Sequence, residues 1–246
     1  MNSDIEVLKK EFRRIKRRGL IESLRSGPTG VGYTFETLLN KKEDQECKPD
    51  FNSIELKCKL AYSKSLLCLF NCVPTRNGES AIKYIFENYN HYRYGNKNSY
   101  KLFERKVYSK YYIERFKISF KLKVDYINTE VVMKSYFDGI FIEDVCKWNF
   151  KVLERKLKSK LNFLAIVQAY PYNVENKLYY KYVKMNIYKL KGFFEFLQLI
   201  ENDKINVSFY MRETISDSGE KIIEDHGVGF KIKTKYIEEL FYEIKT

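Results

Sequence analysis

The segment 53–59 reads SIELKCK and alternates between apolar and charged side chains over most of its length. Such alternation is typical of a β-strand, in which residues two apart share one face. Glu55 and Lys57 are therefore expected to project together, while Ile54 and Leu56 point into the core. Because an unpaired charge within an apolar strand is costly, the segment predicts a strand whose charged face has a functional role.

Two further carboxylates lie just upstream of this strand. Asp50 follows Pro49 at the mouth of the strand. Glu36 lies in a predicted amphipathic helix, directly after a glycine-rich turn at 27–32. The three carboxylates and the lysine are close enough in sequence to meet at one point.

These residue types can together hold a divalent metal ion and a phosphate group. Asp50 and Glu55 supply carboxylate oxygens, with the backbone carbonyl of Leu56 as a third ligand, and Mg²⁺ prefers oxygen ligands. Lys57 would hold or deprotonate an attacking water and stabilise charge on the phosphate. Glu36 could hold a water molecule of the site or help a second metal ion. The alternative interpretation is a surface ion-pair cluster on an edge strand, because short charged patterns often occur by chance.

The composition points to a polyanionic partner. Lys and Arg number 45 against 32 Asp and Glu, which gives a formal net charge of +13. Such an excess favours nucleic acid or an anionic membrane as partner. A lysine-rich surface that merely reflects biased codon usage is the alternative, so charge alone does not decide.

No segment has the pattern of a membrane span or a signal peptide. The longest apolar runs, at 66–70 and 163–167, have the length of strands. The N-terminal residues are polar and amphipathic. The 5 cysteines are an odd number without a framework spacing, which suits a reducing cytoplasm. We therefore expect a cytoplasmic protein without a membrane partner.

The order of predicted elements indicates a mixed α/β fold with prominent antiparallel pairs. A first helix should end near Gly19, and its basic face is either solvated or in contact with phosphates. Further helices are expected at 148–161, 191–201 and from Lys235. Strands are expected at 53–59, 66–73, 115–125, 162–170, 177–188, 205–212 and 226–233, and residues 129–143 should add a further strand and a turn at Asp138-Gly139. One group of tyrosines is expected in the core and on a hairpin surface, rather than as a platform for bases: Tyr84, Tyr89, Tyr92, Tyr94 and Tyr100.

Several motifs carry a resemblance to a known family. They are R-x-G-x-T-G-V-G-x-T-F-E at 25–36, P-D-F-x-x-I-E-L-K at 49–57, K-S-L-L-x-L-F at 64–70, D-H-G at 225–227 and G-F-K-I at 229–232. The chain thereby resembles the MvaI/BcnI family of type II restriction endonucleases. That family is similar to the mismatch-repair nickase MutH, within the PD-(D/E)XK nucleases. The resemblance places the family's catalytic set on Glu36, Asp50, Glu55 and Lys57.

The resemblance also implies a fold and a reaction. The expected fold is a mixed α+β nuclease core, with a central mixed sheet flanked by helices and two lobes that form a DNA cleft. A single nuclease unit would cover 1–246, with a catalytic core at about 1–170 and a DNA-recognition lobe at 171–246. The expected reaction is Mg²⁺-dependent hydrolysis of double-stranded DNA that leaves a 5′-phosphate, with one or two metal ions. The enzyme would act as a monomer that nicks the two strands in turn, at a short site of the CC-(one pair)-GG type such as CCWGG. A cognate DNA methyltransferase would be its genetic partner in the prokaryotic host.

Base recognition is expected from residues near the C-terminus. A histidine such as His226 can donate to guanine, and Asp225 can accept from cytosine N4. Lys231 stands where the family carries arginine, and it lacks the bidentate fork of a guanidinium group, which puts an identical base preference in doubt. Arg212 is a second candidate reader. Other predicted DNA contacts are Lys59, Lys64 and Thr29.

Two alternatives to a restriction enzyme stay open. The first is a MutH-like nickase directed by mismatch repair, which would not cut both strands unaided. The second is a basic DNA-binding protein that no longer cuts, although the complete set Glu36, Asp50, Glu55 and Lys57 argues against it.

Overall fold

The computed structural model describes residues 2–40, 48–94, 99–109 and 117–245. The chain divides into two compact units, each assembled from separate segments. The first unit holds residues 1–65, 156–191 and 238–246, and the second holds 66–155 and 192–237. The predicted lobes have other bounds, so the assignment of catalysis and recognition to separate lobes stays a prediction. No helix in the described ranges is long and apolar enough to cross a membrane.

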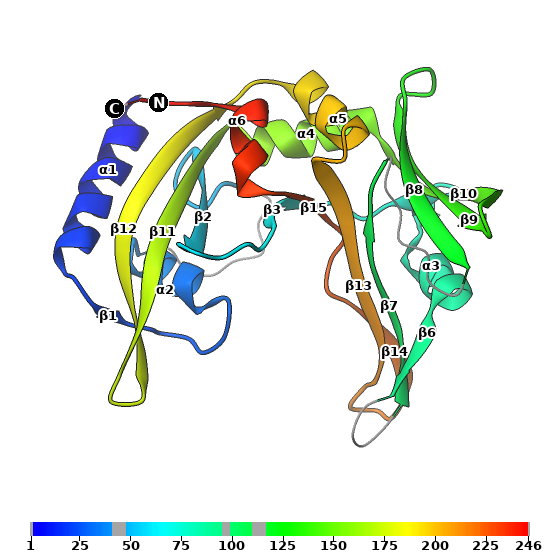
Figure 1. Cartoon of the computed structure of the whole chain (residues 1–246), viewed down its shortest axis with the longest axis horizontal. Helices are drawn as coiled ribbons and strands as arrows, with labels where there is room; N and C mark the ends of the chain where they lie inside the picture. Colours follow the sequence, from blue (N-terminus) through cyan, green and yellow to red (C-terminus); the bar gives the residue numbers. More distant parts are fainter. Residues whose placement is uncertain (1, 41–47, 95–98, 110–116, 246) are drawn as a thin grey trace. The chain divides into compact units, whose positions relative to one another are not determined.

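The first unit is built on a mixed β-sheet. In sheet order its strands are β1 (Ile21–Glu22), β12 (Lys177–Leu190), β11 (Phe163–Val174) and β2 (Ile54–Leu60), and β16 (Phe241–Glu243) also pairs with β12. Strands β2 and β11 are parallel, and the other neighbours are antiparallel. The helices of this unit are α1 (Asn2–Arg17) and α2 (Gly30–Leu38). Figure 1 shows β11 and β12 side by side, with α1 along β12. The mixed sheet with flanking helices agrees with the predicted fold class.

Helix α1 has the amphipathic pattern that the sequence predicted. Ile5, Leu8, Phe12 and Ile15 are buried, because apolar residues spaced by three and four positions share one helix face. The basic residues of the opposite face are mostly exposed.

Aromatic side chains join α1, α2 and β12 beneath the sheet. The Phe35 ring lies 6.4 Å from the Phe12 ring and 5.1 Å from the Tyr182 ring, centroid to centroid. The Tyr182 hydroxyl donates a 2.9 Å hydrogen bond to the Val31 carbonyl. This packing holds α2, which carries Glu36, against the sheet that carries the predicted catalytic strand.

Strand β11 is longer than the sequence predicted, since it continues through Pro171. Its pairing with β2 ends at Ala169, so Pro171 has a neighbouring strand on one side only. Proline has no backbone N–H to donate. It is tolerated at this position because no second strand pairs there and requires that donor. The hairpin closes at Glu175 and Asn176, which both have positive φ, as a tight hairpin turn requires.

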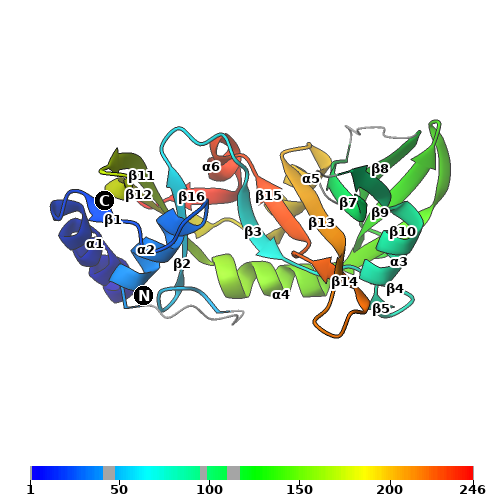
Figure 2. The same ribbon diagram turned by 90° about the horizontal axis from the view of Figure 1, so that it is seen from below.

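The second unit holds two antiparallel sheets. The first follows the order β3 (Leu67–Asn71), β15 (Gly229–Ile232), β13 (Ile205–Ile215), β7 (Ser99–Val107) and β6 (His91–Tyr94), and β14 (Lys221–Asp225) also pairs with β13. The second follows β5 (Glu79–Ser80), β4 (Thr75–Arg76), β10 (Ile140–Asn149), β9 (Glu130–Phe137) and β8 (Ile118–Asp125). Its helices are α3 (Ile82–Tyr89), α5 (Phe193–Glu201) and the 3₁₀ turn η1 (Thr234–Tyr236), and the chain passes between units within α4 (Phe150–Leu161) and α6 (Ile237–Leu240). Figure 2 shows β13 and β15 next to each other in this unit.

Trp148 is the centre of the aromatic core of the second unit. Its indole N–H donates a 2.9 Å hydrogen bond to the Cys72 carbonyl. Its ring lies 6.2 Å from that of Phe209 and 5.5 Å from that of Phe230. Phe230 in turn stacks on Phe70 at 5.2 Å. These contacts tie β10 to β13, β15 and β3.

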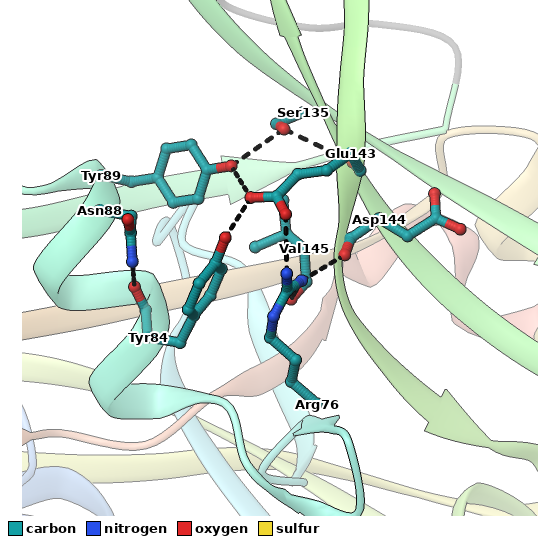
Figure 3. Close-up of polar contacts among 8 residues, drawn as sticks. All are labelled: Arg76, Tyr84, Asn88, Tyr89, Ser135, Glu143, Asp144 and Val145. Carbon is teal, nitrogen blue, oxygen red and sulfur yellow. Dashed lines mark hydrogen bonds and ion pairs between the residues drawn. The ribbon is translucent and has the colours of Figure 1, made fainter.

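Glu143 is the acceptor at the centre of a polar cluster that joins α3 to β10 (Figure 3). Tyr84 and Tyr89 point from α3 toward the same carboxylate oxygen, Oε1, and donate to it at 2.5 and 2.6 Å. The Tyr89 hydroxyl also bonds Ser135 at 3.0 Å. Tyr89 is buried, as predicted, whereas the side chains of Tyr92, Tyr94 and Tyr100 lie outside the described residues.

Arg76 completes this cluster from strand β4. Its guanidinium group donates to Glu143 Oε2 at 2.8 Å and to the carbonyls of Asp144 and Val145 at 2.6 and 3.1 Å. It also lies 3.8 Å above the Tyr84 ring. Strand β4 pairs with β10 at Lys147. The carbonyls of Asp144 and Val145 lie before this pairing, and the Arg76 guanidinium group donates hydrogen bonds to them instead.

Three other predicted elements also differ from the structure. The helix predicted from residue 148 begins at Phe150, because Trp148 and Asn149 end strand β10. The strand predicted at 226–233 is β15, which begins only at Gly229, and β14 was not predicted. The helix predicted from Lys235 is the short pair η1 and α6.

We predict that Glu143→Gln destabilises the protein by about 1–3 kcal/mol, because Arg76 loses a charged partner. Burial raises the pKa of Glu143, but hydrogen bonds from Tyr84, Tyr89 and Arg76 outweigh burial and bring that pKa below 4.5. A carboxyl group whose pKa is lower in the folded than in the unfolded protein stabilises the fold at pH values above the unfolded-state pKa. This contribution is lost as the pH falls through the folded-state pKa. The wild-type advantage in the free energy of unfolding should therefore be full near pH 7 and shrink below about pH 4.5. Urea unfolding at several pH values measures it, with Glu220→Gln as the exposed control; equal effects of the two changes would refute the cluster's role.

We also predict opposite effects for two alanine substitutions in α2. A Cβ at Gly30 would lie 2.3 Å from the Arg25 carbonyl oxygen and 2.8 Å from the Tyr180 hydroxyl, so Gly30→Ala should cost about 1–3 kcal/mol of stability. A Cβ at Gly32 would meet only Glu36, at an ordinary 3.6 Å. Gly32→Ala should therefore gain up to about 1 kcal/mol through helix propensity. Thermal unfolding compares the two, and a stabilised Gly30→Ala variant would contradict the prediction.

Candidate active site and DNA-reading segment

Strand β2 presents Glu55 and Lys57 together, as the alternation predicted. The Lys57 ammonium lies 2.5 Å from Glu55 Oε1. The strand is more buried than expected, because the Glu55 side chain is 0% exposed, like its apolar neighbour Ile54. The Glu55 carboxylate is thus buried within the protein, whereas the Lys57 side chain is partly exposed to solvent.

A tight turn brings Asp50 back onto the same strand. Phe51 and Ile54 exchange two backbone hydrogen bonds, of 2.9 and 2.8 Å, and Asn52 between them has a positive φ of 50°. Asp50 Oδ2 accepts a 3.1 Å hydrogen bond from the backbone N–H of Leu56. The predicted carboxylate therefore reaches the strand at the residue whose carbonyl was expected as a third ligand.

The electrostatic balance at Glu55 is unusual for a carboxylate. Burial raises the pKa of Glu55, the Lys57 charge lowers it, and the Asp50 charge raises it again, so that the pKa lies above its ordinary value. Asp50, held at the Leu56 N–H, therefore brings a second negative charge near Glu55. Two carboxylates in this position favour a cation between them.

The second oxygen of Glu55 fits a metal ion. Glu55 Oε2 is buried and accepts no hydrogen bond from any residue that the structure describes. A buried oxygen of this kind is costly unless a ligand satisfies it. Across the described ranges no three His, Cys, Asp or Glu side chains form a metal cluster. The unsatisfied Glu55 oxygen and the Asp50 carboxylate on the same strand suit a cation such as Mg²⁺, which takes one or two carboxylates and fills its other positions with water and phosphate oxygens.

Glu36 lies on helix α2, which packs against β2. Burial and the nearby Glu36 charge raise the pKa of the Cys58 thiol, and Asp50 and Lys57 also act on it. Glu36 thus lies on the helix that packs against β2, near the part of the strand that carries the other predicted catalytic residues.

Lys160 is a site residue that the sequence did not predict. It lies near the end of α4, and its ammonium is 3.5 Å from Glu55 Oε1. Two lysines therefore contact one oxygen of the buried carboxylate. The signal that could have revealed Lys160 is the parallel pairing of β2 with β11, because α4 leads directly into β11.

The other predicted DNA contacts of the first unit lie near β2 or α2. Lys59 follows Lys57 on the same face of β2, and burial lowers its pKa. Lys64 is exposed in the segment after β2, and Thr29 is exposed just before α2.

The predicted base-reading residues belong to the second unit. Asp225 ends β14, and His226 lies in the connection to β15 rather than on a strand as expected. Asp225 Oδ1 accepts a 2.9 Å hydrogen bond from the Gly227 N–H. The backbone N–H of His226 donates to the Tyr210 carbonyl at 3.1 Å, and its ring lies 5.0 Å from the Tyr210 ring.

Glu224 links two of the predicted readers. Arg212 on β13 lies 2.5 Å from Glu224 Oε2, and His226 Nε2 lies 3.5 Å from Glu224 Oε1. Glu224 was not predicted, because β14 itself was not predicted. Lys231 lies on β15, next to the connection that carries His226.

Glycine is required in this connection by both conformation and space. Gly227 has a φ of +92°, and a Cβ there would lie 2.8 Å from the Asn71 side-chain nitrogen. The close approach of Asn71 from β3 therefore fixes the course of the backbone beside His226.

Comparison with known proteins agrees with the predicted family. The model of the MvaI/BcnI restriction endonuclease family matches residues 9–241. Two solved structures of the restriction endonuclease MvaI are similar to the chain, one in complex with its cognate DNA substrate and one in the absence of DNA. Their TM-scores are 0.86 and 0.60, and each is 28% identical over 99% of this chain and 98% of that chain. No curated protein matches the chain. Since the family model covers nearly the whole sequence, including the β2 site and the 225–232 segment, the chain belongs to the MvaI/BcnI restriction endonuclease family and is a site-specific DNA endonuclease.

Proposed function

We propose that this protein is a type II enzyme that hydrolyses phosphodiester bonds in double-stranded DNA, with Mg²⁺ as cofactor. The observation that carries the proposal is the buried Glu55, which has a lysine on one oxygen and no hydrogen-bond partner, within the described residues, on the other. Asp50 reaches the same strand 3.1 Å from the Leu56 N–H. This arrangement supports a site for a cation and a phosphate.

The roles of the residues follow from their charges and positions. Asp50 and Glu55, with the Leu56 carbonyl, would hold one Mg²⁺ ion. When bound, Mg²⁺ supplies positive charge to the phosphate and makes a water molecule easier to deprotonate. The Lys57 ammonium would donate to a non-bridging phosphate oxygen and orient the attacking water. Water adds to phosphorus and the bond to the 3′ oxygen breaks, which leaves a 5′-phosphate and a 3′-hydroxyl. Glu36 would position a water molecule or serve a second metal ion.

Sequence recognition is proposed for the segment that joins β14 to β15. MvaI has been seen with its cognate DNA substrate, which supports duplex DNA as the substrate here. His226 would donate to a guanine and Asp225 would accept from a cytosine in a short site of the CC-(one pair)-GG type. Arg212 and Lys231 would contribute further base contacts, while Lys59, Lys64 and Thr29 would contact phosphates.

We further propose that the enzyme acts as a monomer in the cytoplasm of its prokaryotic host. It would nick one strand, rebind in the other orientation and nick the second. A cognate methyltransferase would protect the host DNA. Incubation of the purified protein with supercoiled plasmid and Mg²⁺ tests this: linear product supports the proposal, whereas nicked circles alone would favour a MutH-like nickase.

We predict that Asp50→Ala and Lys57→Ala each lower the single-turnover cleavage rate by about 10²-fold or more, because Asp50 would hold the metal ion and Lys57 would stabilise charge on the phosphate in the transition state. DNA affinity measured with Ca²⁺ in place of Mg²⁺ should change far less. Lys189→Ala, an exposed change on β12, is the matched control and should cleave normally. Near-wild-type cleavage by either active-site variant would show that β2 is not the catalytic strand.

We predict that His226→Ala weakens binding to the cognate site by about 1–3 kcal/mol and relaxes specificity at one base pair. Because a base contact adds no phosphate contact, the dependence of affinity on salt should stay the same. Competition binding against all single-base variants of the site measures this. Equal weakening on every sequence would mean that His226 contacts only the DNA backbone.

A further inference from the structure

Two lysines from different elements contact the same oxygen of Glu55. Lys57 approaches Oε1 at 2.5 Å from β2 itself, and Lys160 approaches it at 3.5 Å from α4. The Lys160 side chain is 27% exposed, whereas the carboxylate is 0% exposed. The second ammonium thus reaches inward to a fully buried acid.

The fold places Lys160 at this point in two ways. In the parallel pairing of β2 with β11, Phe163 lies opposite Ile54 and Leu164 opposite Glu55. The end of α4, just before β11, is therefore at the level of Glu55 along the sheet. Leu157 and Leu161 are buried to 0% exposure, and Lys160 lies between them in sequence, so their packing sets the direction of its side chain.

Helix α4 carries three other lysines. Lys151 and Lys158 are exposed, whereas Lys156, like Lys160, is half-buried. The helical period of 3.6 residues therefore places Lys160 beside the buried face of α4, and Lys151 and Lys158 on its exposed face.

The two oxygens of Glu55 have different surroundings. Oε1 has two ammonium groups, and Oε2 is buried without a hydrogen bond from the residues that the structure describes. A carboxylate that is held at one oxygen from two directions cannot rotate freely about its terminal bond. The free oxygen is then kept in one orientation.

We propose that Lys160 is a positioning residue of the cleavage reaction, which holds Glu55 Oε1 so that Oε2 is presented to the divalent cation. This inference rests on the proposed metal-dependent function of the same site. Lys160 acts through Glu55, and it contacts neither the cation nor the DNA. It plays the part that outer residues commonly play around a metal ligand, where their loss costs about 10–100-fold in metal affinity or activity.

The test compares Lys160→Met, which keeps the aliphatic stem and removes the charge, with Lys160→Arg, which keeps the charge. Lys151→Ala removes a lysine from an exposed position of the same helix as the control. Mn²⁺ binding is followed by the electron paramagnetic resonance of the free ion, without DNA cleavage. The same proteins are then assayed for single-turnover cleavage across Mg²⁺ concentrations, for cognate DNA affinity without metal, and for thermal unfolding.

For Lys160→Met we expect Mn²⁺ affinity about 10–100-fold weaker than that of the wild type. The half-saturating Mg²⁺ concentration should rise by a similar factor, and metal-free DNA affinity should stay within about twofold. Lys160→Arg should recover part of the loss, and Lys151→Ala should match the wild type. If Lys160→Met unfolds, Lys160→Arg still tests the idea, since an arginine that fits poorly should shift the metal dependence.

Three outcomes would overturn the proposal. Unchanged metal affinity and cleavage in Lys160→Met would show that the contact has no role. Tighter Mn²⁺ binding would show that Lys160 only competes with the cation. A loss of metal-free DNA affinity without a loss of metal affinity would make Lys160 a phosphate contact. A wild-type protein that neither binds Mn²⁺ nor cleaves DNA would instead overturn the proposed function itself.

Discussion

The burial of one carboxylate, that of Glu55, is the constraint on which the site depends. A carboxylate with the exposure of Glu55 is stable in a protein only if cations or donors replace its lost hydration. Lys57 and Lys160 supply that replacement at one oxygen, and the opposing charge of Asp50 works against it. The proposed divalent cation would offset the repulsion that remains, and a site built in this way therefore suits metal-dependent phosphate chemistry.

The sheet of the first unit positions the charged groups around Glu55. Parallel pairing sets the end of α4 beside the start of β2, and the turn at Asn52 folds Asp50 onto the same strand. Phe35 anchors α2 to the core and so brings Glu36 to β2. The second unit relies instead on an aromatic core around Trp148 and on the polar cluster around Glu143. Packing therefore provides rigid frames, and the chemistry lies at the ends and faces of strands.

Local patterns succeeded where the relevant contacts are local. The period-two alternation correctly predicted β2 and the contact of Glu55 with Lys57, and the 3.6-residue period correctly predicted the buried face of α1. The same patterns missed Lys160 and Glu224, because each acts on a residue from another strand or helix. His226 was assigned to a strand, since a run of apolar residues and glycines does not reveal where pairing begins.

By itself, the sequence determined the family and the charged residues of strand β2, because these depend on neighbouring residues and on motifs of short range. Tertiary structure alone decided how deeply Glu55 is buried, which lysines hold it and which of its oxygens is left for a ligand. The physical reason is that burial and ion pairing are set by segments far apart in the chain, here β2, α4 and β11, whose register no local spacing encodes.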